Sequence, residues 1–242
     1  MPTIRTMIFP WAAAAKALYP PLFARESTSL LRVFLPLIAV LIAVWFITVP
    51  IHELLHVAGC LVSGGRVTEL TIQPMYGGTL LSKLFGFITP GGDYAGQLTG
   101  FDTAGSDRCY FVTVCFPFLL TIFLGFPLLV LAARSGHVLW HGIGIIHTIL
   151  PIASLMGDYY EMGSIAATRL LGYAPGSETA ALFRGDDLVL VLTRVWEAAP
   201  AHGTLVVTAG FLLGVVFVVV TLDLSILMSR LVIRNNEKRL DK

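Results

Sequence analysis

The feature that most restricts the fold is an uncharged apolar run from Val33 to Ile51, which resumes after a short polar interruption as Val57 to Val62. A helix that crosses a membrane needs about 20 such residues, because the hydrocarbon core is about 30 Å thick and each residue rises about 1.5 Å. The chain is 56% hydrophobic and 13% charged, and its mean hydropathy is +0.81. These values predict a membrane protein and argue against a soluble domain.

Further apolar runs are long enough to cross the membrane. They extend from Cys109 to Ala133, from Val138 to about Leu170, and from Leu205 to about Ile233. Together with the first run they predict an all-α polytopic membrane protein with about four transmembrane helices.

The expected surroundings follow from the same composition. A formal net charge of +1 gives no reason to expect nucleic acid as a partner. The lipid bilayer is the expected environment, and we expect an integral, multi-pass protein in a bacterial inner membrane. The oligomeric state stays open.

The least hydrophobic block is the loop 63–108 after the first span. Residues Arg66 to Ile72 alternate between polar and apolar side chains as a strand does, and a second candidate strand lies near Thr79 to Ile88. The sequence therefore predicts a small β-hairpin segment after the first transmembrane helix. Residues Pro90 to Gly96 are rich in turn formers and predict a loop.

Four regions are expected along the chain. Residues 1–30 form either an interfacial helix or a flexible tail, and residues 31–170 form a core of three spans that includes the loop 63–108. Residues 171–204 are an extramembrane connection, in which Asp187 to Ala198 predicts a short amphipathic helix. Residues 205–242 contain the fourth span and a basic tail.

Ionisable residues interrupt the first apolar run as His52-Glu53-Leu54-Leu55-His56. Positions i and i+4 share one helix face, so both imidazoles can reach one metal ion, and Glu53 lies beside them. This H-E-x-x-H spacing is typical of zinc peptidases, in which the glutamate takes a proton from water that the metal activates. Ionisable groups at membrane depth cost about 2.5–3.5 kcal/mol each on insertion scales, which favours a functional role over chance.

A tetrahedral zinc ion needs a third protein ligand beside two histidines and an open position for water. Asp158 is the candidate, because it lies within the third span and Gly157 before it allows another helix to approach closely. Glu161 is one turn further along the same helix face. It is the alternative ligand, or else a partner that accepts a hydrogen bond from a ligand histidine.

The order of these motifs resembles the site-2 protease family of intramembrane zinc metalloproteases. The resemblance covers about residues 33–170 and rests on HELLH late in one span, a glycine-rich segment with strand character, an intervening span, and an aspartate in the next span. It implies His52, His56 and Asp158 as ligands of Zn²⁺ and Glu53 as catalytic base. Residues Leu150 to Asp158 differ from the family's usual N-x-x-P…L-D-G pattern and contain no matching asparagine.

Two functions of different classes follow from these residues. The first is an intramembrane zinc endopeptidase that hydrolyses peptide bonds in or near the transmembrane segments of membrane-protein substrates. The alternative is a non-proteolytic zinc-binding membrane scaffold or transporter subunit. Glu53 favours the enzyme, because binding of zinc alone does not require that carboxylate.

Two orientations of the chain in the membrane are possible from the sequence. Basic residues before the first span, Arg134 in a short turn and the basic tail predict that both termini are cytoplasmic. Residues 63–108 and 168–204 then lie on the other side. The family resemblance implies the opposite depth, with the metal nearer the cytoplasm.

Overall fold

The computed structural model describes residues 30–200 and 202–240, and it describes side chains for residues 34–200 and 202–231. The segment 1–30, for which the sequence predicts an interfacial helix or a flexible tail, lies outside the described residues except for Leu30. Most of the basic tail has no described side chains either.

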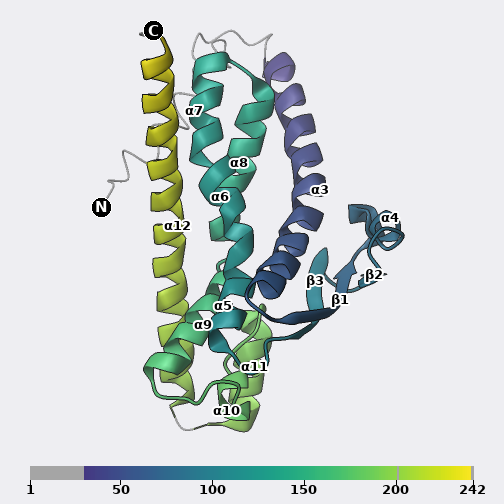
Figure 1. Cartoon of the computed structure of the whole chain (residues 1–242), viewed down its shortest axis with the longest axis vertical. Coiled ribbons are helices and arrows are strands. Elements are labelled where there is room, and N and C mark those ends of the chain that lie inside the picture. Colours follow the sequence, from purple (N-terminus) through teal and green to yellow (C-terminus); the bar gives the residue numbers. More distant parts are fainter. Residues whose placement is uncertain (1–29, 201, 241–242) are drawn as a thin grey trace. The chain divides into compact units, whose positions relative to one another are not determined.

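The described chain is mostly helical and has a small sheet after its first long helix (Figure 1). In chain order the elements are α3 (Leu30–Val62), β1 (Arg66–Ile72), η2 (Pro74–Tyr76), α4 (Gly78–Leu81), β2 (Ile88–Pro90), β3 (Gly96–Asp102), α5 (Asp107–Cys115), η3 (Phe116–Phe118), α6 (Leu119–Leu124), α7 (Phe126–Ser135), α8 (Val138–Ala153), α9 (Asp158–Leu170), α10 (Glu178–Ala181), α11 (Leu188–Ala198) and α12 (Gly203–Leu240).

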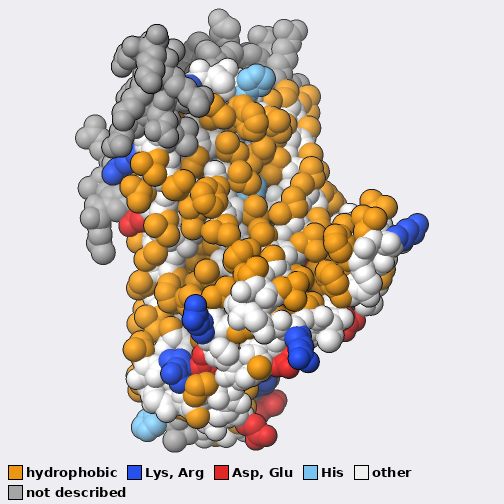
Figure 2. Space-filling model, in the orientation of Figure 1, with side chains coloured by type: hydrophobic (Ala, Val, Ile, Leu, Met, Phe, Trp, Pro, Cys, Tyr) orange, Lys and Arg blue, Asp and Glu red, His pale blue; other side chains and the backbone are white. Residues whose placement is uncertain are grey.

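Three helical segments are long and apolar enough to cross a membrane: Phe34–Val62, Asp107–Ser135 and Gly203–Leu231. A fourth candidate is the broken pair Val138–Ala153 and Asp158–Leu170. The prediction of an all-α polytopic protein with about four spans is confirmed, and the chain is a multi-pass membrane protein by the length and composition of its helices. Hydrophobic side chains cover most of the visible long-helix surface in Figure 2.

Contacts divide the described residues into two units. The helical unit contains 30–46, 118–151 and 220–240, and the site unit contains 47–117, 152–200 and 202–219.

A serine holds a helix break together in the helical unit. The helix is interrupted at Gly125, between α6 and α7, so Phe126 begins a new helix and its backbone N–H needs a partner outside that helix. The Ser225 hydroxyl of α12 accepts a hydrogen bond from Phe126 N at 3.1 Å and donates one to Thr121 O at 2.7 Å. These bonds satisfy backbone groups that hydrocarbon cannot. Leu129 and its neighbours pack beside them as a buried cluster.

The sheet belongs to the site unit and has the strand order β2-β1-β3. Strand β1 pairs in parallel with β2 at Leu70 and Ile88, and it pairs antiparallel with β3. Its inward side chains Leu70 and Ile72 are fully buried and cluster with Ile88 and with Val57 of α3. The sheet is therefore attached to the same helix that carries the HELLH sequence.

This arrangement corrects one detail of the predicted hairpin. The expected strand near Thr79 to Ile88 contains the short helix α4, and only Ile88–Pro90 forms β2. Gly77 has a φ of 87°, and a Cβ atom on Gly78 would lie 2.0 Å from the carbonyl oxygen of Ile72, so the chain folds back tightly there. Parallel pairing of β1 with β2 requires a crossover rather than a two-residue turn, and η2 and α4 supply it.

The predicted amphipathic helix is confirmed as α11. Asp187 caps it, because its Oδ1 atom accepts hydrogen bonds from Val189 N and Leu190 N at 2.8 and 3.1 Å. One face of the helix packs Leu188 and Val191 into a buried cluster of the site unit.

Candidate metal centre

The two histidines of the HELLH sequence lie on one face of α3, which continues unbroken through Pro50 and past both residues. His52 and His56 are buried, and their ring centroids are 4.9 Å apart at an interplanar angle of 80°. The helix ends beyond them at Val62, and Gly64 then turns the chain with a φ of 95°. Spacing along the helix therefore suffices to bring both imidazoles together.

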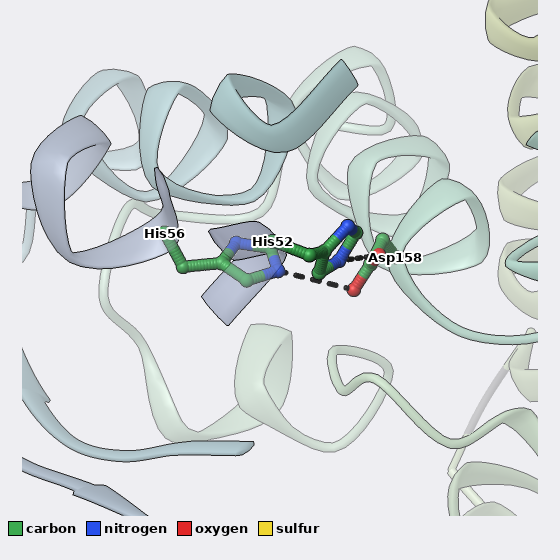
Figure 3. A group of neighbouring side chains, drawn as sticks. All are labelled: His52, His56 and Asp158. Carbon is green, nitrogen blue, oxygen red and sulfur yellow. Dashed lines mark hydrogen bonds and ion pairs between the residues drawn. The ribbon is translucent and has the colours of Figure 1, made fainter. Parts of the chain in front are cut away.

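Asp158 meets these histidines from a different element, because it is the first residue of α9. Its Oδ2 atom lies 3.1 Å from His52 Nε2, and its Oδ1 atom lies 3.6 Å from His56 Nε2 (Figure 3). One ligand atom from each of the three residues lies within 4.8 Å of the others. A carboxylate at the start of a helix is also stabilised by the helix dipole.

The tautomer of His56 bears on whether His52, His56 and Asp158 fit a metal ion. His56 Nδ1 lies 2.9 Å from the carbonyl oxygen of Thr113, so in the neutral ring Nδ1 carries the proton and donates it. The Nε2 lone pair then faces the Asp158 carboxylate at 3.6 Å. Two electron-rich atoms directed at each other repel, and a cation between them removes the repulsion. Two imidazole nitrogens and a carboxylate oxygen are also a common set of metal ligands, so the residues fit a bound metal ion.

Glu53 is buried beside this group on α3 and lies within electrostatic range of His56 and Asp158. Strand β3 passes directly over it at Gly96, where a Cβ atom would lie 2.4 Å from Glu53 Cγ. A larger residue at position 96 therefore displaces the glutamate or the strand.

Glu161 lies outside the three-residue group, although it follows Asp158 by one turn of α9. Its Oε1 atom accepts a hydrogen bond from the Tyr110 hydroxyl of α5. Of the two candidate third ligands, the structure thus brings Asp158 to the histidines and pairs Glu161 with a tyrosine.

Two hydrogen bonds connect the segment over Glu53 to the loop before α11. Tyr94 Oη donates to Asp187 Oδ2, and Gln97 Nε2 donates to Asp186 Oδ2, both at 2.8 Å. The Tyr94 bond is the largest cause of a lowered pKa at the Asp187 carboxyl and of a raised pKa at the Tyr94 phenol. The start of α11 is also bonded to the segment before Asp158, because Leu188 N donates to Met156 O, two residues before that aspartate.

Sequence reasoning missed several of these contributors. Thr113 acts through its backbone carbonyl, which no side-chain pattern can reveal. Gly96 stands in a stretch that the sequence predicts to be a loop, although it begins β3. Tyr110 could have been found from the sequence, since a tyrosine hydroxyl in an apolar span usually has a polar partner.

Comparison of the chain with protein-family models, curated proteins and solved structures finds no significant match. The side-chain geometry is therefore what supports a function.

Proposed function

We propose that the chain is an intramembrane zinc endopeptidase of the kind that the site-2 protease resemblance predicts. The observation that carries the proposal is the buried group of His52, His56 and Asp158, whose ligand atoms lie within 4.8 Å of one another in helices long enough to span a membrane. Ionisable side chains at membrane depth cost free energy of insertion, so a buried cluster of them favours a functional role.

Zinc is the proposed metal because the donor set has two imidazoles and one carboxylate. His52, His56 and Asp158 would hold the ion and leave one position for water, and zinc would lower the pKa of that water to about 7. The Thr113 carbonyl supports this arrangement by keeping the proton of His56 on Nδ1 and the lone pair on Nε2.

Glu53 is the proposed general base. It follows His52 directly on α3, is buried, and lies within electrostatic range of the metal group. In this role its carboxylate takes a proton from the attacking water and gives it to the amine nitrogen that leaves when the peptide bond breaks. A zinc-binding scaffold has no need of that proton transfer.

The proposed substrate is a partly unwound transmembrane segment of another membrane protein. Strand β1 lies between β2 and β3, and over Leu70 to Ile72 it is paired on both sides. Strand β3 is an edge strand and begins at Gly96 against Glu53. An extended substrate that adds to β3 brings its peptide bonds past the glutamate.

Two measurements on the purified full chain test the proposal. Wild-type protein is expected to carry about one zinc ion per chain, and His52→Ala or His56→Ala to lose most of it, because two protein ligands hold the ion poorly. Wild type is also expected to cleave a transmembrane peptide in detergent, whereas Glu53→Gln keeps its zinc and loses cleavage. Zinc-loaded wild type that cleaves none of a panel of transmembrane peptides would favour the scaffold or transporter subunit. Wild type that takes up no zinc would refute both.

A further inference from the structure

A hollow of about 550 Å³ opens in the site unit between the start of α5 and the end of α9. It is separate from the metal group. Its wall combines charged or polar side chains with apolar ones, among them Ser106, Asp107, Arg108, Phe111, Ile165 and Arg169. We call it the α5–α9 hollow.

The hollow lies where the candidate spans meet polar loops. One candidate span begins at Asp107, and the second helix of the broken span ends at Leu170. Arg108 and Arg169 of the hollow therefore lie where apolar helices meet polar loops. The flanking loops meet just outside, where a Cβ atom on Gly176 would lie 3.1 Å from the Cα atom of Gly105. Basic side chains at such a boundary face the headgroup layer of a membrane. In Figure 2 charged side chains gather around α9 to α11 and the sheet.

Two arginines of the hollow, Arg108 and Arg169, are available to bind an anion. Asp107 is already neutralised, because Arg184 binds it with two hydrogen bonds of 2.7 and 3.1 Å and is itself buried. Arg169 reaches the same carboxylate only through Nε at 3.5 Å, and 51% of its side chain is exposed. Arg108 is exposed and has no ion-pair partner among the described residues.

An acidic ligand with an apolar part matches this wall. We propose that the α5–α9 hollow binds an anionic phospholipid, with the phosphate between Arg108 and Arg169 and an acyl chain against Phe111. Guanidinium groups bind phosphate oxygens with paired hydrogen bonds, and basic pockets between transmembrane helices hold lipid headgroups in this way. Free inorganic phosphate shares the headgroup chemistry but makes no use of the apolar wall. This binding site does not depend on the peptidase proposal.

The test uses the purified full chain in detergent, titrated with phosphatidylglycerol, phosphatidylcholine or inorganic phosphate, and native mass spectrometry counts the bound molecules. Each arginine is expected to contribute about fivefold in affinity, so Arg108→Gln weakens phosphatidylglycerol binding about fivefold and the double variant with Arg169→Gln about 25-fold. Lys83→Gln is the matched control, because it removes one exposed positive charge of the site unit outside the hollow. It is expected to bind as wild type does.

The variants separate a binding defect from a folding defect. Arg108 makes no ion pair among the described residues, so its substitution leaves the Asp107 network intact, and an unchanged thermal unfolding curve checks this. Glu53→Gln is expected to bind lipid normally, so a failed peptidase test leaves this site standing. The lipid assignment is overturned if phosphatidylglycerol binds no tighter than phosphatidylcholine, or if Arg108→Gln and the double variant bind as wild type does. It is also overturned if inorganic phosphate binds as tightly as the lipid.

Discussion

Gly163→Ala is expected to remove zinc although this residue does not touch the metal group. Gly163 lies on α9 where that helix contacts α12 backbone to backbone within the site unit. A Cβ atom at this position would lie 2.0 Å from Gly210 O and 2.6 Å from Gly214 N. Small residues let transmembrane helices approach this closely, and here they hold the helix that carries Asp158.

The size of the effect follows from that distance. Ordinary contact with a Cβ atom requires 3.4 Å or more, so an added methyl group separates the two backbones by more than about 1 Å, since neither can rotate away as a side chain does. Metal–ligand distances tolerate about 0.2 Å. Asp158 is on the same helix, so we expect zinc affinity to fall by at least the roughly 10–100-fold that a disturbed supporting residue produces, with about 1–3 kcal/mol of lost stability.

Competition with a chelator measures the zinc affinity, and thermal unfolding measures the stability. Gly86→Ala is the matched control, because a Cβ atom at Gly86 meets no atom within 4 Å, and it is expected to match wild type in both measurements. The reasoning fails if folded Gly163→Ala binds zinc with wild-type affinity. In that case either the contact with α12 does not position α9, or Asp158 is no ligand.

Three further predictions address the site and its surroundings. Asp158→Asn is expected to be metal-poor and nearly inactive, whereas Glu161→Gln keeps its zinc with activity lowered about 10–100-fold, as metal analysis and peptide cleavage will show; the reverse pattern would make Glu161 the ligand. Cysteines introduced near Lys83 and Gly185 are expected to react from the non-cytoplasmic side, and labelling only from the cytoplasm would mean that the family orientation prevails over the basic residues. The folded pKa of Asp187 is lowered, chiefly by the bond from Tyr94, so its stabilising contribution is present above the unfolded pKa of about 3.9 and disappears as pH falls through the folded value. Asp187→Ala is therefore expected to cost about 1 kcal/mol at neutral pH, and a thermal-unfolding difference from wild type that does not shrink as the pH falls below about 4 would contradict this.

The helices and the histidine pair could be predicted from the sequence because both depend on local spacing. An uncharged run such as Val33 to Ile51 can satisfy its backbone groups inside a bilayer only as a helix. Within that helix, 3.6 residues per turn place His52 and His56 on one face whatever the rest of the chain does. The same local rule makes Asp187 the cap of α11, since its side chain bonds to backbone two and three residues ahead.

Strand pairing could not be predicted in the same way. Each candidate strand shows only its own alternation, and partners and direction depend on how the intervening chain turns. The close approach of Gly78 to Ile72 makes that turn a crossover, so β2 joins β1 in parallel and β3 takes the other edge beside Glu53. This placement makes β3 an edge strand and puts β1 in the middle of the sheet.

Only the tertiary structure brings Asp158, which is 106 residues from His52, to within 3.1 Å of it. On the sequence Asp158 and Glu161 share one face of one helix, and Gly157 beside Asp158 is what favours it as the ligand. They differ in their partners: Glu161 accepts a hydrogen bond from the Tyr110 hydroxyl, whereas Asp158 lies against the histidines of α3. Which acid joins the two histidines is therefore a property of how helices far apart in the chain pack, which depends on side-chain volumes and close glycine contacts rather than on local periodicity.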